Sequence, residues 1–433
     1  MQDTPEPVWA FHPEPLPPDP ALAMDEEIEG LLDRANQALG RLDGITLLLP
    51  NPDQFIYSYV RKEAVLSSQI EGAQSSLSDL LLFEQEAAPT VSPEDVRETS
   101  NYIAAMDLGL RLLKEGLPVS LRLIRAIHGS LLQSGRGSER DPGEFRSSQN
   151  WVGGSRPGNA RFVPPPPHLV TQAMGDLEKF LHDDPVASRT LVKAALAHAQ
   201  FQTVHPFLDG NGRVGRLLIT LLLCDEKILS RPLLYLSLFL KRNRDAYYEA
   251  LQRIRTHGDW EHWLRFFLEG VVEVAEGATD TTMRLVRLID EDRKKVHGLG
   301  RAAGTAISLY EHALSSILVT APRTARRLGV SEPTTYKAIR HLEGLGIQGD
   351  DRTRRRPHMG LRQLPRDHER GFLAGRQARR DDLPAGPAIA PECLPAREQW
   401  PEGRCGRLAG TSTMPAAGFE PATPGLGNLC SIP

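Results

Sequence analysis

The stretch HPFLDGNGRVGR, His205 to Arg216, lies between the alanine-rich run RTLVKAALAHAQFQTV and the apolar run LLITLLLC. In both flanking runs apolar residues recur three and four positions apart, which predicts a helix on either side. Gly210 and Gly212 can take positive φ, so successive backbone N–H groups can converge on an oxyanion where the second helix begins. The stretch therefore predicts a phosphate-binding loop between two helices.

The charged residues of this stretch suit a polyphosphate with a metal ion. Arg213 and Arg216 lie on one face of the second helix, where each can contact phosphate oxygens in a fork geometry. Asp209 offers a hard oxygen ligand for Mg²⁺, and Asn211 can either donate to a phosphate or hold the loop. His205, at the end of the first helix, is a candidate general base for an incoming hydroxyl.

Other interpretations of these residues are weaker. GNGRVG fits the dinucleotide pattern G-x-G-x-x-G, but a helix and not a strand is predicted before it. A calcium loop needs alternating oxygen ligands after Asp209, where Arg213 and Val214 stand instead. DGNG alone is a common turn. The complete string favours a functional site.

Most of the remaining chain predicts helix. AMDEEIEGLLDRANQALGRLDG, FIYSYVRKEAVLSSQIEG and LSDLLLFEQEA have helical apolar spacing, and APTVSPED contains a proline-bearing helix start. SSQNWVGGSRPGNARFVPPPP differs, because two short aromatic or β-branched pieces flank a Gly/Pro/Asn turn. We expect a mainly α fold that carries one β-hairpin.

A small module follows Gly304. SSILVTAPRTARRLGVSEPTTYKAIRHLEGLGI has two helices joined by the turn LGVSEP, with Thr335, Lys337 and Arg340 expected on the outer side of the second helix. This spacing predicts a winged-helix-like fold; the alternative is a helical hairpin used for packing or dimerisation. Residues 351–433, rich in Arg, Pro and Gly, predict a disordered tail. Its end resembles a translated transfer-RNA gene, so we hypothesise a reading-frame slip near Gly346 to Asp350.

Composition limits the partners and the location. The 433 residues carry a net charge of -4, which does not favour nucleic acid as the main partner. The N-terminus is acidic and proline-rich and so lacks the features of a secretory signal, and no stretch is apolar for long enough to span a bilayer. We expect a cytoplasmic protein without membrane contact.

The string His205 to Arg216 resembles the signature of Fic-domain proteins, H-x-F-x-D/E-G-N-G-R-x-x-R, at every specified position. The resemblance implies transfer of AMP from ATP to a hydroxyl of a target protein, with release of pyrophosphate. It also implies that His205 deprotonates the target and that Asp209 holds Mg²⁺ on the phosphates. The backbone of residues 210–213 would form the anion hole, and Arg216 would hold the γ-phosphate.

The resemblance gives roles to further residues. Phe207 would anchor the loop in the core, and Asn243, in KRNRDAYY, would contact the base or ribose. Gly212, where some relatives have lysine, favours AMP transfer over phosphate transfer. The nucleotide-binding residues are thus Gly210, Asn211, Gly212, Arg213, Arg216 and Asn243.

Two segments outside the central string also match the family. The hairpin resembles the flap that pairs with an extended target segment, with contacts expected from Val152, Gly153, Gly154, Phe162 and Val163. LSSQIEG matches the inhibitory motif S/T-x-x-x-E-G/N. Glu71, on one helical face with Ser67 and followed by Gly72 as a helix cap, would pair with Arg216 and displace the γ-phosphate.

The expected protein is a self-inhibited adenylyltransferase that modifies a Ser, Thr or Tyr hydroxyl of a target protein or of itself. Two alternatives remain: removal of AMP, with Glu71 orienting a water, and a DNA-binding regulator with a nucleotide-sensing core. DNA binding by the winged-helix-like module and homodimer formation stay open. The expected segments are 1–110 with the inhibitory helix, 111–275 as the Fic core with flap 147–167 and motif 205–216, 276–304 as a helical connector, 305–350 as the winged-helix-like module and 351–433 as the tail.

Overall fold

The computed structural model describes residues 8–49, 52–84, 91–300, 303–314, 318–347, 358–360, 420–422 and 429–430. The chain divides into two compact units, one formed by Met1–Gly298 with Gly418–Pro433 and the other by Leu299–Ala417. Apart from three short strands, the tail predicted for residues 351–433 lies outside the described residues, and so does most of the proposed frame-slip site.

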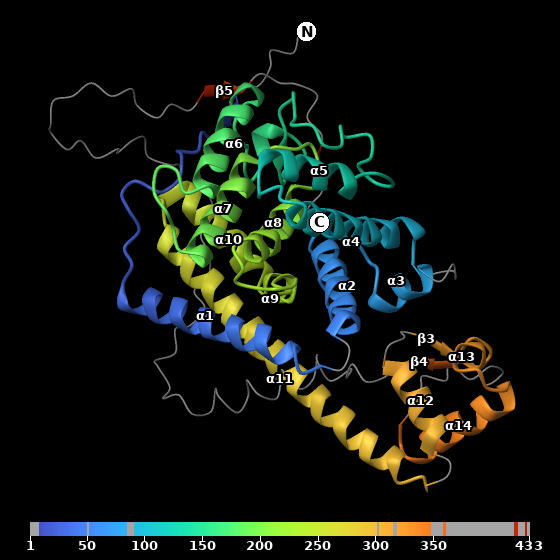
Figure 1. Ribbon diagram of the computed structural model, residues 1–433. Helices are drawn as coiled ribbons and strands as arrows, with labels where there is room; N and C mark the ends of the chain where they lie inside the picture. Colours follow the sequence, from blue (N-terminus) through green and yellow to red (C-terminus); the bar gives the residue numbers. More distant parts are fainter. Residues whose placement is uncertain are drawn as a thin grey trace, which may run out of the picture. The chain divides into compact units, whose positions relative to one another are not determined.

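The first unit is a helical body (Figure 1). Its helices are α1 (Glu26–Thr46), α2 (Pro52–Ile70), α3 (Leu77–Phe83), α4 (Pro93–Lys114), α5 (Leu121–Leu131), α6 (Pro167–Leu181), α7 (Thr190–Val204), α8 (Asn211–Asp225), α9 (Ser237–Arg242), α10 (Arg244–His257) and α11 (Trp260–His297). α1 lies along α11, and α11 continues without a break through the boundary expected at residue 275.

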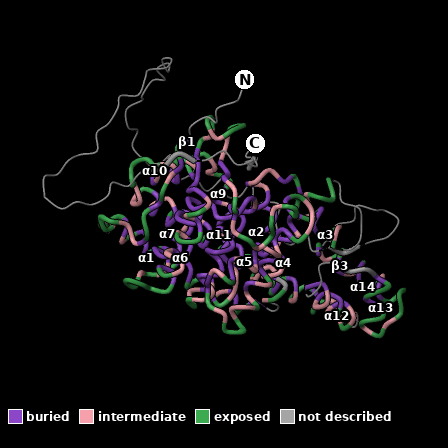
Figure 2. The backbone as a smooth tube through the Cα atoms, turned by 90° about the horizontal axis from the view of Figure 1, so that it is seen from above, coloured by how far each residue is buried: buried purple, intermediate pink, exposed green. Residues whose placement is uncertain are grey.

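The centre of this unit is formed by α7 and α8. Leu191–Val204 of α7 are all buried, because its alanine-rich sequence lets neighbouring helices approach on every side. α8 is buried from Val214 through Leu223. Buried residues accordingly fill the middle of the unit, and exposed residues lie at its periphery (Figure 2). The loop between α7 and α8 thus starts and ends on buried helices of the core.

Helix α2 ends in a Schellman motif that positions Glu71. Gly72 has φ 98°, and its N–H donates to the Gln69 carbonyl at 3.2 Å. The next N–H, of Ala73, donates to the Ser68 carbonyl at 3.1 Å. Glycine takes this left-handed conformation without a steric penalty. The motif sets the direction in which the chain leaves α2, and it thereby positions Glu71, the residue directly before Gly72.

The strands are short. In the first unit, β1 (Val8–Ala10) pairs antiparallel with β5 (Glu420–Ala422), and β2 (Trp151–Val152) pairs parallel with β6 (Leu429–Cys430). The expected hairpin is reduced to β2, a 3₁₀ turn (Pro157–Asn159) and one antiparallel bridge between Val152 and Phe162. Among the described helices, none combines the length and the apolar character that crossing a bilayer requires.

The second unit contains α12 (Ala303–Leu314), β3 (Leu318–Thr320), α13 (Ala321–Leu328), α14 (Glu332–Gly344) and β4 (His358–Gly360), with β3 and β4 antiparallel. Lys337 and Arg340 are exposed, as expected. The placement of Thr335 on the outer side of α14 was wrong, since this residue is 1% exposed. Thr335 shares its face with Ala338, Ile339 and Leu342, which pack inward.

Candidate active site

The loop between α7 and α8 is held in shape by Asn211. Its Nδ2 donates to the Phe207 carbonyl at 2.8 Å, and the Phe207 N–H donates to its Oδ1 at 2.9 Å. The loop starts at His205, with φ 49° and ψ 59°, and ends at Gly210, with φ 77°. Of the two roles predicted for Asn211, the described contacts are those of holding the loop.

Phe207 anchors the loop as expected, being 0% exposed. It stacks on His128 of α5, with ring centroids 3.7 Å apart. Nδ1 of His128 accepts from the Gly143 N–H at 2.8 Å, so Nε2 donates to the Asp209 carbonyl, 3.1 Å away. Burial lowers the pKa of His128 to about 4 and keeps the ring neutral. Sequence reasoning missed His128, which lies in an ordinary amphipathic helix.

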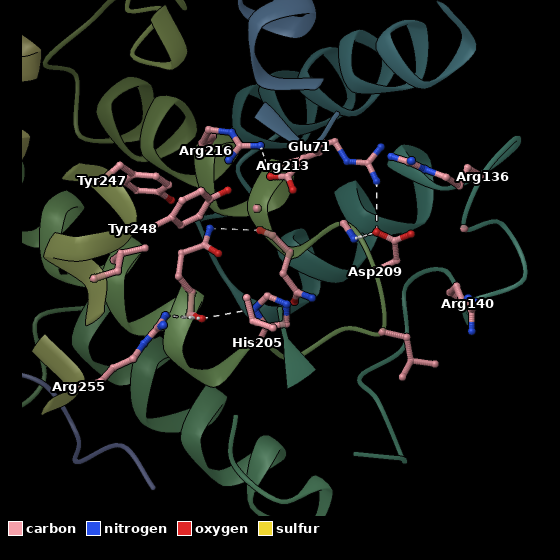
Figure 3. A pocket seen from close by; sticks show the side chains of 18 of the residues that line it. Glu71, Arg136, Arg140, His205, Asp209, Arg213, Arg216, Tyr247, Tyr248 and Arg255 are labelled. Carbon is pink, nitrogen blue, oxygen red and sulfur yellow. Dashed lines mark hydrogen bonds and ion pairs between the residues drawn. The ribbon is translucent and has the colours of Figure 1, made fainter. Parts of the chain in front are cut away.

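A cavity of about 180 Å³ opens beside this loop. Figure 3 shows its side chains: Arg216 and Glu71 lie at one end, His205 and Arg255 at another, and Asp209 to the side. The predicted site residues that line it are Glu71, Val152, His205, Asp209, Gly210, Asn211, Gly212, Arg213 and Arg216. The lining residues that the sequence did not indicate are Arg136, Gly137, Glu139, Arg140, Gln202, Leu208, Tyr247, Tyr248, Leu251 and Arg255.

His205 is buried at the wall of the cavity, with 8% of its surface exposed. Nδ1 lies 3.4 Å from the Gln202 carbonyl, which can only accept, so the proton is on Nδ1 and Nε2 holds the lone pair. Burial and the nearby charge of Arg146 lower the pKa of His205 to about 3. The imidazole is therefore neutral over the physiological range and able to accept a proton.

Asp209 and Arg213 form a polar wall of the cavity, next to α4. Arg213 is 1% exposed; its Nη1 lies 2.7 Å from Oε1 of Glu98, and its Nη2 lies 3.5 Å from Oδ1 of Asp209. Asp209 keeps 31% of its side chain exposed. Among the residues that the structure describes, no group of three or more His, Cys, Asp or Glu converges on a metal position. A Mg²⁺ ion held by Asp209 would thus take its other ligands from water and phosphate, which is its usual preference.

Gly212 leaves space beside α8 and does not have a positive φ. It lies in the first turn of α8, so the expected left-handed conformation is confined to Gly210. A Cβ at Gly212 would lie 2.1 Å from Oε1 of Glu71, well inside contact distance. The missing side chain leaves room for the Glu71 carboxylate directly against α8.

Arg216 is held by the end of α2. Its Nε donates to Ser67 Oγ at 2.8 Å, and its Nη2 donates to the Ser67 carbonyl at 3.1 Å and to Glu71 Oε1 at 2.7 Å. Burial raises the pKa of Glu71, but the charge and hydrogen bond of Arg216 outweigh it and hold that pKa below its usual range. The pKa of Arg216 is raised in turn, because the Glu71 charge outweighs the effect of burial. Both groups are charged.

A second buried carboxylate supports this face of α2. Glu63, 5% exposed, accepts from the Ser237 N–H at 3.2 Å and from the Tyr102 hydroxyl at 3.2 Å. Glu63, Ser67 and Glu71 are spaced four apart, so they share one face of α2. Burial raises the pKa of Glu63. Sequence reasoning singled out two of these three residues and missed Glu63.

The flap contributes one side chain to the cavity lining. Val152 lines it and exchanges backbone hydrogen bonds with Phe162 at 2.8 and 3.2 Å. Gly153 and Gly154, with φ of 70° and 73°, form the turn; a Cβ at Gly154 would lie 2.4 Å from a carbonyl oxygen. Val163 is 8% exposed and packs in a small core away from the cavity.

Asn243 lies at the junction of α9 and α10 and is outside the cavity lining. Its Nδ2 donates to the Phe239 carbonyl at 3.0 Å. On the same helix, Tyr247 and Tyr248 do line the cavity. The base or ribose contact expected of Asn243 stays a prediction.

This helical core carries a glycine-containing loop, a neutral histidine and a carboxylate at one cavity, and its sequence matches two family models. Residues 30–111 match the model of the Fic/DOC family N-terminal region, and residues 118–223 match the Fic/DOC family model. The matches identify a Fic domain in residues 118–223, preceded by the N-terminal region of the same family.

Similar proteins include three named as protein adenylyltransferases. The Drosophila ananassae protein is 32% identical over 39% of this chain and 32% of its own. The Caenorhabditis briggsae protein is 32% identical over 36% and 30%, and that of Culex quinquefasciatus is 27% identical over 66% and 56%. The chain thus spans about a third to a half of these relatives.

A solved Fic family protein from Desulfovibrio desulfuricans shares the fold. It aligns with a TM-score of 0.55 at 19% identity and covers 78% of this chain and 97% of its own.

Proposed function

We propose that this protein is a cytoplasmic adenylyltransferase that transfers AMP from ATP to a hydroxyl of a target protein. The observation that carries the proposal is the joining, at one cavity, of the neutral His205 imidazole with the loop that begins α8. The names of the similar proteins support the same activity.

In the proposed reaction, the hydroxyl oxygen of the target attacks the α-phosphorus of ATP. The bond from that phosphorus to the bridging oxygen breaks, and pyrophosphate leaves. Nε2 of His205 takes the hydroxyl proton, a task for which its lone pair is suited. The N–H groups at the start of α8 would stabilise the charge on the phosphate oxygens.

Asp209 would hold a Mg²⁺ ion, whose charge would offset that of the phosphates. Its carboxylate fits this role because it is part-exposed to the cavity and an oxygen ligand. Arg216 would hold the γ-phosphate, provided that its present partner leaves.

The proposed enzyme inhibits itself through Glu71. The carboxylate lies 2.7 Å from Nη2 of Arg216, where a phosphate oxygen of ATP would bind. ATP in the productive orientation and Glu71 on Arg216 therefore exclude each other. The reverse reaction, removal of AMP with Glu71 orienting a water, uses the same residues.

The test is incubation with ATP labelled on the α- or the γ-phosphate, followed by intact-mass measurement of the protein. We expect label from α-labelled ATP alone and a mass increase of one AMP on the protein itself. Transfer of γ-label would reject AMP transfer. Loss of AMP from a modified protein, without addition, would favour the reverse reaction.

We propose DNA contact as a second function, for the module α12–α14. Its described exposed residues include five cations on α13 and α14: Arg323, Arg326, Arg327, Lys337 and Arg340. Exposed cations on two helices joined by a short turn suit phosphate contact. The test is binding of the full chain to duplex DNA at rising salt, with Arg326→Glu and Arg340→Glu as variants. Equal binding by these variants would reject it.

A further inference from the structure

Arg146 is a buried cation whose hydrogen bonds all go to backbone carbonyls. It is 3% exposed. Its Nε donates to the His205 carbonyl at 3.0 Å and its Nη1 to the Ser148 carbonyl at 3.3 Å. Its Nη2 donates to the carbonyls of Pro165 and, at 3.4 Å, of Val204. One side chain thus contacts three separate segments.

These carbonyls belong to the two parts of the chain that the proposed reaction must align. Ser148 and Pro165 lie at the two ends of flap 147–167. Val204 and His205 lie at the end of α7, where helix carbonyls lack internal partners and favour a cation. The backbone N–H of Arg146 also donates to the Pro206 carbonyl at 2.9 Å.

The left-handed conformation of His205 makes this contact consequential. A residue other than glycine takes φ 49° only where its surroundings enforce it. Two side chains hold the His205 carbonyl: Arg146 and, at 3.4 Å, Nδ2 of Asn150. Asn150 also donates to the Phe207 carbonyl at 2.9 Å.

The charge of Arg146 has carbonyl dipoles as its counterparts. Among the described residues, no ion pair of Arg146 with a carboxylate is recorded, and burial lowers the pKa of its guanidinium to about 9. Its positive charge lies close enough to lower the pKa of His205. The residue therefore acts on His205 through both geometry and charge.

We propose that Arg146 is a positioning residue that ties both ends of the flap to the backbone of His205. The target segment on the flap and the base that acts on it then keep one relative geometry. This inference rests on the proposed transfer of AMP.

The test compares Arg146→Gln and Arg146→Lys, both in the Glu71→Gly background. The matched control is Arg253→Gln, which removes an arginine that pairs with Asp259 on the exposed side of α10. We expect Arg146→Gln to lower kcat by about 10- to 100-fold, since small displacements of reacting groups have effects of this size. The KM for ATP should change less than about threefold, because Arg146 is outside the cavity lining.

The second readout is independent of turnover: histidine NMR of His205 against pH, without ATP. In Arg146→Gln the pKa of His205 should rise, because a nearby positive charge is lost, and the acidic limb of the rate profile should move to higher pH. Arg146→Lys keeps the charge but not the fork, so its His205 titration should match the parent while kcat recovers only in part.

The outcomes separate the two proposals. If the Glu71→Gly parent transfers no AMP, the proposed function fails, and the His205 titrations still decide whether Arg146 acts on His205. If Arg146→Gln leaves kcat and the titration like those of Arg253→Gln, the inference is overturned. Should thermal melting show that Arg146→Gln is unfolded, Arg146→Lys decides: parental kcat in that variant overturns the role of the fork.

Discussion

Two buried arginines serve the same cavity with different kinds of partner. Arg216 is bound by the side chains and one carbonyl of α2, including the Glu71 carboxylate. Arg146 is bound by four backbone carbonyls. A carboxylate at the end of a helix can move away and leave room for a phosphate, whereas a carbonyl moves only with its chain. We therefore expect Arg216 to exchange partners and Arg146 to keep them.

Burial makes the difference between a carboxylate partner and carbonyl partners energetically important. At about 4 Å and an effective dielectric near 20, two unit charges attract by about 4 kcal/mol before desolvation is subtracted. A bias of about 1.4 kcal/mol already changes a population tenfold. In the proposed function, exchange of Glu71 for a phosphate at Arg216 would therefore switch the site without unfolding the protein.

The largest expected effect comes from removing the imidazole of His205, whose backbone carbonyl Arg146 holds. His205→Ala should lower transfer by about 10²- to 10⁴-fold, since a general base contributes this much, while ATP binding stays near the parental value. Radiolabel transfer and calorimetric ATP titration measure the two quantities. Transfer at the parental rate would show that another group accepts the proton.

The next effect should distinguish the arginines by stability. Arg146→Ala removes a donor from four backbone carbonyls, three of them in buried hydrogen bonds, so we expect it to lower the free energy of unfolding by about 3 kcal/mol or more. Denaturant unfolding with Arg253→Ala as the exposed control measures it. If the free energy of unfolding falls no more than in the control, the carbonyl contacts of Arg146 do not hold it more firmly than an exposed arginine is held.

A smaller effect should come from the exchangeable side. Glu71→Gly should raise self-modification tenfold or more, because Arg216 becomes available to the γ-phosphate. Adding Arg216→Ala should abolish the gain. Time courses with α-labelled ATP test both variants. A double variant as active as Glu71→Gly would show that Glu71 acts through another group. A Glu71→Gly variant no more active than the parent would make Glu71 an ordinary helix residue.

The smallest effect concerns protons. The pKa of His205 is about 3 in the folded state, below its ordinary value near 6.5, so the unfolded state binds the proton first as pH falls. The neutral imidazole of His205 therefore contributes to the free energy of unfolding in full above about pH 6.5, and this contribution is lost as the pH falls toward 3. The melting temperature of the parent should therefore fall more steeply between pH 7 and 5 than that of His205→Ala, with His257→Ala as control. Equal slopes would contradict the buried neutral imidazole.

The sequence predicted the features that depend on residues close together in the chain. Apolar spacing predicted α1, α2 and α7, and the string His205 to Arg216 predicted which side chains meet at the cavity. The carbonyl contacts of Arg146 and the stacking of His128 join segments far apart in the chain, and no local pattern encodes them. The prediction that Thr335 is exposed was wrong for a related reason. Helical spacing shows which residues share a face, but not which face packs against the rest of the fold.

Gly212 shows how one volume joins two parts of the chain. Glu71, in the N-terminal family region, occupies with Oε1 the space that a Cβ at position 212, in the second region, would fill. A side chain at position 212 would have to push the carboxylate away from α8. The empty volume at Gly212 therefore sets how closely the end of one region of the chain can approach the helix of the other.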